Sequence, residues 1–413
     1  MIVLRRRIPQ PDHCSTIRVW VHPNGGGNDD RRASWCIPTM VMSPAQVDAD
    51  VCALLYPTDT LCSSVTLRWF DRQQRQVERP VWDEGVWKGM QYTQHMPVPL
   101  SSSEAIAQHT TKPGAGALLN SLDPLQSGYF VVRPKEQWIW PAQMIGERVS
   151  LPRVVPPNPP KEGPGSLSTS SDKGQTPPDK EQTVSLVLET MSVRPRIFKI
   201  EDFLSDHEAN VLRELAENQL QPSKLYEKGE LVVSPARNSK QGWLYVGQNK
   251  TSDAVSERVR QLVGQGNTPA EIALAEAIQV VRYQPGEHYH SHYDYLPAGQ
   301  LASDGQGQYE QRLLTVFLYL GDVEEGGQTC FPYVGPTGYV YAGGLGVDWK
   351  DCSRGLIVTP RKGMALLWYN LLAENHLAGD PDVLTLHAGC DVVRGTKYAA
   401  NVWIHNVLLR PIP

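Results

Sequence analysis

A segment rich in proline, glycine and serine divides this sequence and limits the folds that it can adopt. It covers residues 154–183 and contains the run PPNPP at residues 156–160. A segment of this composition has too few apolar side chains to build a hydrophobic core, and it is typical of a disordered linker. We therefore predict two folded units, in residues 1–153 and in residues 184–413, since a chain of 413 residues is long enough for both.

The first unit has the pattern of a small α+β domain. β-Branched and aromatic side chains over residues 16–21 and 64–70 predict two strands. A helix is predicted from residue 44 onward, with Ser43 as its N-cap and Pro44 in its first turn. The cysteines of this unit lack the Cys-x-x-Cys spacing of a zinc site, and no catalytic pattern is present. We therefore expect an accessory domain.

The second unit begins with helical signals and continues with strands. The sequences SDHE at residues 205–208 and TPAE at residues 268–271 are capping boxes, and each predicts the start of a helix. Apolar runs then predict strands over residues 279–283, 313–320, 363–369 and 398–405. Helices followed by strands favour a double-stranded β-helix, or jelly roll, with a helical buttress. The fold class predicted for the chain is α+β.

Composition and charge narrow the range of functions. The net charge of −5 gives no sign of nucleic-acid binding, and a hydrophobic content of 40% is ordinary for a globular protein. Because no run of about eighteen apolar residues is present, we expect no transmembrane segment. The start of the chain, MIVLRRR, lacks the apolar core of a signal peptide.

A His-Tyr-Asp motif at residues 292–294 is the first sign of catalytic chemistry. It follows a predicted strand and a turn, in a segment where alternate side chains of an extended chain share one face. His292 and Asp294 can therefore bind one metal ion. His288 and His290 lie on the same face, so spacing alone does not decide which histidine is a ligand.

Two later residues, His387 and Lys397, complete this pattern. His387 lies in a second short apolar run, and strands that are distant in sequence become neighbours in a jelly roll. Two imidazoles and one carboxylate form the facial triad that holds Fe(II) and leaves positions open, although the same donors also suit a catalytic zinc. Lys397 could hold a dicarboxylate beside the metal, unless it is an ordinary surface lysine. The pattern points to an iron- and 2-oxoglutarate-dependent oxygenase.

The region after residue 196 contains a series of motifs in a characteristic order. They are RNS (237–239), WLY (243–245), EAIQVVRY (276–283), GGQTCFP (326–332), PRKGMALLWYN (360–370), HAGC (387–390), RGTK (394–397) and WIH (403–405). Their order and spacing resemble those of the prolyl 4-hydroxylases, and most closely those of the transmembrane prolyl 4-hydroxylase subgroup. The resemblance covers a little over half of the chain.

The resemblance implies a role for each residue of the candidate site. Alignment on the family's Tyr-x-x-His-x-Asp motif makes the metal ligands His292, Asp294 and His387. The other two histidines of that segment are then neighbours of the site. Lys397 is the fourth catalytic residue, and it would bind 2-oxoglutarate together with the hydroxyl groups of Tyr283 and Thr329. The implied cofactors are Fe(2+), 2-oxoglutarate as co-substrate, O2 and L-ascorbate.

The same resemblance implies a groove for a proline-containing peptide, which would be hydroxylated at C4 of proline. Six residues would line this groove: Arg237, Ser239, Glu276, Tyr289, Arg312 and His405. Aromatic and hydrogen-bonding side chains suit proline peptides, which are pre-organised in the polyproline II conformation. Some of the six have a structural alternative, since Glu276 and Arg312 could form an internal ion pair.

Several alternatives stay open at this point. Besides peptidyl-proline hydroxylation, the chain could be an oxygenase of the same fold that acts on a lysyl side chain or a small molecule, or a non-catalytic peptide-binding module. The family implies the endoplasmic reticulum, although the sequence shows neither a signal peptide nor a membrane anchor. Cys352 and Cys390 lie where related enzymes carry cysteines, and either a disulfide or two free buried thiols would fit.

Overall fold

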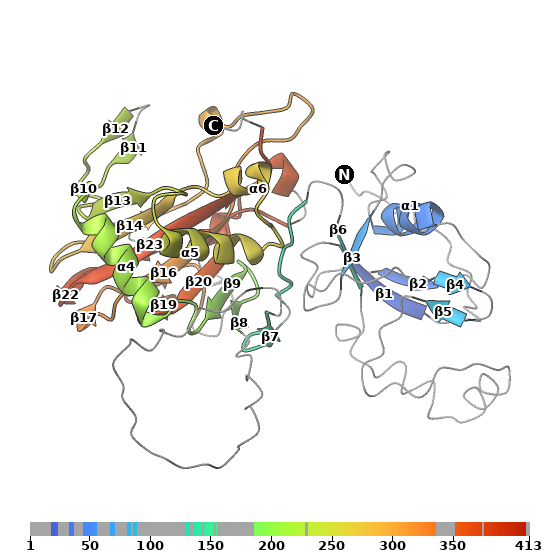
Figure 1. The fold of residues 1–413 in the computed structure, drawn as a ribbon, viewed down its shortest axis with the longest axis horizontal. Helices are drawn as coiled ribbons and strands as arrows, with labels where there is room; N and C mark the ends of the chain where they lie inside the picture. Colours follow the sequence, from blue (N-terminus) through green and yellow to red (C-terminus); the bar gives the residue numbers. More distant parts are fainter. Residues whose placement is uncertain are drawn as a thin grey trace, which may run out of the picture. The chain divides into compact units, whose positions relative to one another are not determined.

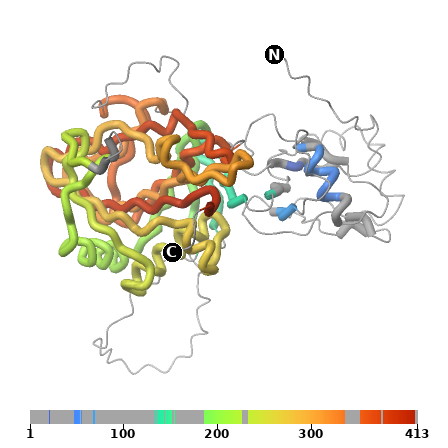
Figure 2. The backbone as a smooth tube through the Cα atoms, turned by 90° about the horizontal axis from the view of Figure 1, so that it is seen from above, coloured from blue at the N-terminus to red at the C-terminus, as the bar shows by residue number. Residues whose placement is uncertain are grey.

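The structure is a computed structural model whose elements Figures 1 and 2 colour along the chain. It describes residues 18–23, 33–36, 44–55, 67–70, 81–83, 86–88, 129–132, 136–142, 144–151, 154, 186–227, 230–335, 352–373 and 376–409. The chain divides into two compact units, Met1–Pro141 and Ala142–Pro413. This boundary lies earlier than the predicted one at residue 153, because β7 (Arg148–Ser150) pairs with β8 (Val187–Ser192) of the second unit. The predicted linker, 154–183, lies outside the described residues except for Val154.

The described strands of the first unit form a four-stranded sheet in the order β2-β1-β6-β3. Their bounds are Arg18–Pro23 (β1), Ala33–Cys36 (β2), Arg68–Phe70 (β3) and Tyr129–Val132 (β6), and a separate hairpin joins Val81–Asp83 (β4) to Val86–Lys88 (β5). The helix predicted from Pro44 is present as α1 (Pro44–Leu55). The buried Asp48 carboxylate of α1 accepts hydrogen bonds from the Leu67 backbone (3.0 Å) and the Trp69 indole (2.9 Å), which ties the helix to the sheet.

The second unit contains a nine-stranded sheet in the order β10-β13-β14-β23-β16-β20-β9-β8-β7. The bounds not yet given are Ile197–Ile200 (β9), Gln221–Pro222 (β10), Lys240–Leu244 (β13), Ile278–Tyr283 (β14), Arg312–Tyr319 (β16), Ala365–Tyr369 (β20) and Lys397–His405 (β23). The four strands that apolar runs predict correspond to β14, β16, β20 and β23. The last strand in the sequence, β23, lies between β14 and β16 inside the sheet, and it is antiparallel to both.

A second, four-stranded sheet faces the large one. Its order is β15-β21-β18-β19, with bounds Tyr289–His292 (β15), His387–Gly389 (β21), Thr329–Phe331 (β18) and Leu356–Val358 (β19). Short pairs join Leu225–Glu227 (β11) to Glu230–Val232 (β12), and Glu325–Gly326 (β17) to Val392–Arg394 (β22). One buried cluster includes Tyr319 and Trp368 of the large sheet and Phe331 and Val358 of the small sheet. The two sheets therefore pack around one core, as in the antiparallel jelly roll that the sequence predicts.

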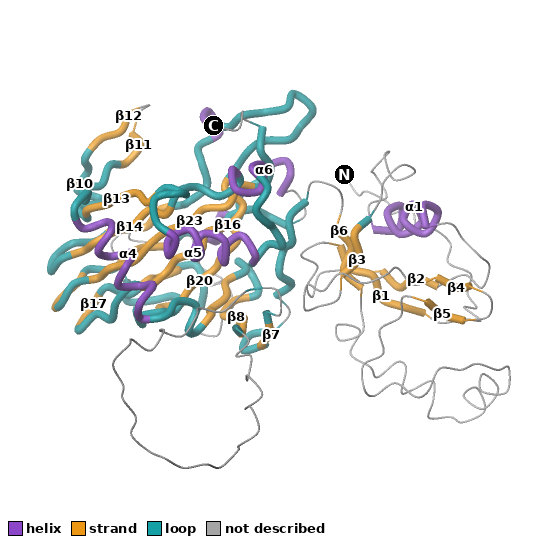
Figure 3. Tube along the Cα trace, in the orientation of Figure 1, coloured by secondary structure: helices purple, strands orange, loops and turns teal. Residues whose placement is uncertain are grey.

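Helices lie along one side of the large sheet (Figures 1 and 3). The helix α4 (Asp206–Glu217) contacts β13 and β14, and α5 (Lys250–Gln261) contacts β23. Both predicted capping boxes are present, one at Ser205 before α4 and one at Thr268 before α6 (Pro269–Ala273). Short 3-10 helices cover Ala298–Gln300, His376–Ala378 and Val383–Thr385. Among the described residues, no helix has the length and apolar character needed to cross a bilayer.

Candidate metal centre

Strand pairing in the small sheet brings two distant histidines together. The strands β15 and β21 are antiparallel, and His292 is the direct register partner of His387. Asp294 follows β15 after one intervening residue, so its side chain returns to the face that carries His292. The jelly-roll topology therefore unites residues that are widely separated in the sequence.

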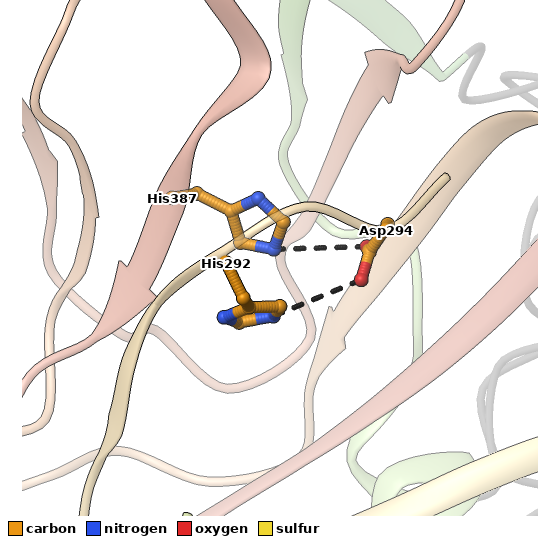
Figure 4. Close-up of side chains that lie close together, drawn as sticks. All are labelled: His292, Asp294 and His387. Carbon is orange, nitrogen blue, oxygen red and sulfur yellow. Dashed lines mark ion pairs between the residues drawn. The ribbon is translucent and has the colours of Figure 1, made fainter. Parts of the chain in front are cut away.

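The side chains of His292, Asp294 and His387 point toward one another (Figure 4). The Nε2 atom of His292 lies 3.7 Å from Asp294 Oδ1, and the Nε2 atom of His387 lies 3.6 Å from Asp294 Oδ2. One potential ligand atom from each of the three residues lies within 4.8 Å of the others. A single metal ion can therefore reach all three residues.

The backbone fixes which nitrogen of each imidazole faces the centre. The Nδ1 atom of His292 lies 2.8 Å from the carbonyl oxygen of His290, and that of His387 lies 2.9 Å from the carbonyl oxygen of Thr385. Since a carbonyl oxygen only accepts, each Nδ1 carries the proton and each Nε2 keeps its lone pair. This arrangement is typical of histidines that bind a metal through Nε2.

The electrostatics of the cluster favour the metal-binding protonation states. Burial, and secondarily the neighbouring His387, lower the pKa of His292 well below its usual value, so this imidazole is neutral near neutral pH. Burial raises the pKa of Asp294, but His387, His292, Arg312 and the hydrogen bond from Thr315 together outweigh it, so the net pKa is lowered. An ionised carboxylate and imidazole nitrogens with free lone pairs fit the facial triad of Fe(II), and they also suit zinc.

The two other histidines of the segment take no part in this cluster. His288 Nδ1 lies 2.8 Å from a carboxylate oxygen of Asp391, and the His288 ring stacks on His290 with 4.4 Å between centroids. Within the described residues, the group that could hold a metal ion consists of His292, Asp294 and His387. The choice that spacing left open is thus made by the fold.

Lys397 is buried in the barrel, with 1% of its surface exposed. It begins β23, faces Tyr283 of β14 in register, and its Nζ lies 5.4 Å from the ring centroids of Tyr283 and Phe317. Burial lowers the pKa of Lys397 to about 7, and no acidic side chain of the described residues forms an ion pair with it. A buried ammonium without an anion is costly, so this position suits an anionic ligand.

The ammonium of Lys397 lies close to Gly389 of β21, the strand that also carries His387. A Cβ atom added at Gly389 would lie 3.8 Å from Lys397 Nζ, so the ammonium approaches β21 where that strand lacks a side chain. Gly389 also pairs with Thr329 of β18, and the Thr329 hydroxyl accepts a 2.7 Å hydrogen bond from Tyr319. The sequence had singled out Thr329 but not Tyr319, whose position in an apolar strand gave it the character of a core residue.

The pKa of the Tyr283 hydroxyl is raised by burial, which outweighs the opposing effects of Arg237 and Ser239. Ser239 also lies 3.4 Å from Nε of Arg237, whose guanidinium lies 4.6 Å above the ring of Tyr289. The Tyr289 ring in turn stacks on the imidazole of His292, with centroids 3.4 Å apart. Three of the six residues expected to line the groove therefore form one contact chain that ends at a candidate metal ligand.

The other three residues that the sequence predicts to line the groove, Glu276, Arg312 and His405, form an ion-pair network. Arg312 binds both oxygens of Glu276, at 2.6 and 2.9 Å, and His405 Nε2 lies 2.9 Å from the same carboxylate. Although burial opposes it, these partners lower the pKa of Glu276 to about 2. Arg312 also donates a 3.2 Å hydrogen bond to the backbone carbonyl of Asp294. The internal ion pair that the sequence left open is present, and it supports the candidate metal site.

A groove of about 610 Å³ opens beside the metal cluster. It is lined by Pro235, Asn238, His288, Tyr289, His290, Cys352, Ala388, Gly389, Cys390 and Asp391. Cys352 and Cys390 are joined by a disulfide, with their Cα atoms 5.9 Å apart, which decides the question that the sequence left open. Because Tyr289 and Gly389 belong to the strands that carry the histidine ligands, the groove borders the candidate centre.

Comparisons with known proteins identify the same region of the chain. The model of the 2OG-Fe(II) oxygenase superfamily matches residues 278–405. Prolyl 4-hydroxylase 2 of Arabidopsis thaliana is 34% identical over 219 residues, which are 52% of this chain and 69% of the relative. Prolyl 4-hydroxylase subunit alpha-1 of Rattus norvegicus is 30% identical over 214 residues, 51% of this chain and 35% of the relative. The chain thus spans about a third of that animal subunit.

A viral protein is among the solved structures that are similar to this chain. It is the viral collagen prolyl hydroxylase vCPH from Paramecium Bursaria Chlorella virus-1, described as a 2OG complex. It is 28% identical, with a TM-score of 0.36, and the match covers 51% of this chain and 96% of that chain.

Proposed function

Because the chain belongs to the prolyl 4-hydroxylase family, we propose that it is an Fe(II)- and 2-oxoglutarate-dependent dioxygenase that hydroxylates peptidyl proline at C4. The observation that carries the proposal is the cluster of His292, Asp294 and His387 together with the buried Lys397. The narrower resemblance to the transmembrane subgroup stays a prediction.

The three clustered side chains would hold the iron. Two imidazole nitrogens and one carboxylate leave coordination positions for a co-substrate and for O2. When bound, the iron supplies the oxidising chemistry that places one oxygen atom on the substrate and the other on 2-oxoglutarate, which loses CO2. L-Ascorbate would keep the iron reduced. The protein's own contribution is to position the ligands and to shield the site.

Lys397 would bind the distal carboxylate of 2-oxoglutarate. Its ammonium lies in a dry environment, where a charge-assisted hydrogen bond to a carboxylate is strong. Thr329 would add a hydroxyl group, oriented by the hydrogen bond that it accepts from Tyr319. Tyr283, whose ring centroid lies 5.4 Å from the Lys397 ammonium, would contribute its own hydroxyl.

The groove beside the cluster would hold the peptide. Extended proline-rich segments suit grooves that offer flat aromatic faces. Tyr289 lines this groove, and the guanidinium of Arg237 lies 4.6 Å from its ring centroid. Because Tyr289 stacks on His292, a substrate that contacts Tyr289 would lie next to the iron. Ser239, Glu276, Arg312 and His405 would act mainly by holding these groups in place.

The endoplasmic reticulum is the compartment that we propose. The disulfide between Cys352 and Cys390 supports this, because disulfides persist in oxidising compartments and are rare in the cytosol. Cell fractionation with an antibody to the full chain would test it, and recovery of the protein in the cytosol with reduced cysteines would count against it.

The function itself can be tested by mass spectrometry. The full chain would be incubated with Fe(II), 2-oxoglutarate, ascorbate and a library of proline-rich peptides. We expect a gain of one oxygen on proline, its loss in His292→Ala, and normal activity in His207→Ala, a control histidine exposed on α4. Oxygen on lysine instead would favour the alternative substrate, and no product with any peptide would contradict the proposal.

A further inference from the structure

The carboxylate of Asp294 has a second set of partners on the large sheet. Its Oδ2 atom accepts a 2.7 Å hydrogen bond from the hydroxyl of Thr315, a residue of β16. The same hydroxyl oxygen accepts a 3.0 Å hydrogen bond from Nδ2 of Asn370, which follows β20 directly. These contacts join the candidate metal ligand to two strands that carry no metal ligand.

The direction of this relay follows from the number of protons. A threonine hydroxyl donates one hydrogen bond, and an ionised carboxylate only accepts. The Thr315 proton therefore goes to Asp294, and Thr315 must receive its second bond from a donor, which is the amide nitrogen of Asn370. A flipped Asn370 amide would set its oxygen against the Thr315 oxygen, with no proton between them. The relay runs from Asn370 through Thr315 to Asp294.

Burial makes the relay strong and rigid. Thr315 and Asn370 have no exposed surface, and Asp294 is 6% exposed, so bulk water does not compete for these bonds. The backbone holds Asn370 on both sides, since its N–H donates to Leu313 (2.8 Å) and its carbonyl accepts from Asp382 (2.8 Å). Asn370 is thus held at the end of β20 by backbone hydrogen bonds to β16 and to Asp382.

We propose that Thr315 and Asn370 are positioning residues for the metal centre. By engaging Oδ2, they hold the Asp294 carboxylate in the orientation in which its oxygens face the Nε2 atoms of His292 and His387. A carboxylate free to rotate would be less well prepared to bind a metal together with the two imidazoles. This role rests on the proposed metal site, and it makes Thr315 and Asn370 responsible for the orientation of one ligand.

A purely structural interpretation predicts a different result. Buried carboxylates need hydrogen bonds, and Thr315 could serve only to satisfy one. In that case loss of the hydroxyl would lower the stability of the metal-free protein and leave the affinity for metal unchanged. The two interpretations therefore separate in the dissociation constant of the metal.

The test measures metal binding by the full chain, with Fe(II) added under anaerobic conditions and tryptophan fluorescence as the readout. We expect Thr315→Val to raise the Kd for Fe(II) by about 10- to 100-fold, the range for partners of metal ligands. Thr315→Ser keeps the hydroxyl and should restore the Kd to near the wild-type value. Thr190→Val removes another buried hydroxyl, on β8, and should leave the Kd unchanged.

Each outcome decides the inference. A Kd for Thr315→Val within about twofold of wild type overturns it, as does an equal loss in Thr315→Ser. If Thr315→Val does not fold, Asn370→Leu, which removes the donor at similar volume, must raise the Kd severalfold or the inference fails. Wild-type protein that binds no Fe(II) at all would instead refute the proposed function, so the two failures are distinguishable.

Discussion

Two buried polar clusters in the second unit differ in how their charges are satisfied. Between α4 and α5, Arg258 donates to both carboxylate oxygens of Glu208, at 3.1 and 2.7 Å, and to the carbonyl oxygen of Phe203. In the candidate metal centre, the Nδ1 atoms of His292 and His387 donate hydrogen bonds to backbone carbonyl oxygens, while both Nε2 atoms face Asp294. We call the first cluster closed, because its charged groups are paired with each other and with the backbone. We call the second cluster open, because its two Nε2 atoms keep lone pairs that a metal ion could use.

The difference separates a stabilising cluster from a functional one. Removing one partner of a closed, buried ion pair leaves the other charge uncompensated, so such a pair acts on folding. An open cluster keeps its reactive atoms free, with their protonation and orientation set by partners behind them. Lys397 shares this property, since its buried ammonium forms no ion pair with an acidic side chain in the described part of the chain.

The strongest test of the open cluster removes a ligand. His292→Ala should abolish turnover and reduce the affinity for Fe(II) by more than about 100-fold, because a direct ligand matters more than its outer partners. Anaerobic titration followed by fluorescence measures the affinity, and circular dichroism confirms the fold. If His292→Ala bound Fe(II) as tightly as the wild type, the distinction between the open and the closed cluster would be wrong.

The closed cluster should respond in the opposite way. Arg258→Met should lower the free energy of unfolding by about 3–5 kcal/mol, the usual effect of removing one partner from a buried ion pair. The protein that remains folded should bind Fe(II) with wild-type affinity. Urea denaturation and the same titration would measure both, and a selective loss of metal binding with unchanged stability would contradict the distinction.

Lys397 should act on the co-substrate and not on the metal. Lys397→Met should raise the Kd for 2-oxoglutarate by about 100-fold, as a charged hydrogen bond contributes about 1.5–3 kcal/mol. Lys397→Arg should restore binding only in part, since a planar fork differs from a compact ammonium. Isothermal titration with Fe(II)-loaded protein provides the measurement, and unchanged affinity in Lys397→Met would remove this residue from the site.

A further prediction concerns the stability of the metal-free protein and its pH dependence. Burial lowers the pKa of Lys397 from its ordinary value of 10.5 to about 7 in the folded chain, so above pH 7 the unfolded state binds more protons. Stability should therefore rise with pH between about 7 and 10, by at most about 1.4 kcal/mol per unit from this group. Urea denaturation across that range should show a steeper rise in the wild type than in Lys397→Met, and equal slopes would contradict the burial of Lys397.

The sequence identified those parts of the site that depend on residue chemistry. Two imidazoles, a carboxylate and a later lysine form an unusual combination that pointed to Asp294, His387 and Lys397, and the resemblance to the prolyl 4-hydroxylases selected His292 as the other candidate ligand. Spacing could not decide which of His288, His290 and His292 is the ligand, because alternate residues of a strand point to the same face. Strand register and the hydrogen bonds behind each ring provide that information.

Features that depend on strand pairing escaped the sequence. Thr315 and Asn370 meet Asp294 only because β16 and β20 are neighbours, and the local pattern does not encode that pairing. The one available signal was a polar residue inside the apolar run at 313–320. The early domain boundary was missed for the same reason, since β7 is short and pairs across the predicted linker.

Binding of 2-oxoglutarate under anaerobic conditions tests the central claim most directly, because it requires the metal cluster and Lys397 together. Isothermal titration of the full chain should show one 2-oxoglutarate per protein when Fe(II) is present, with much weaker binding in its absence. Both His292→Ala and Lys397→Met should abolish the tight phase. Binding of 2-oxoglutarate that is indifferent to the metal and to both substitutions would contradict the account.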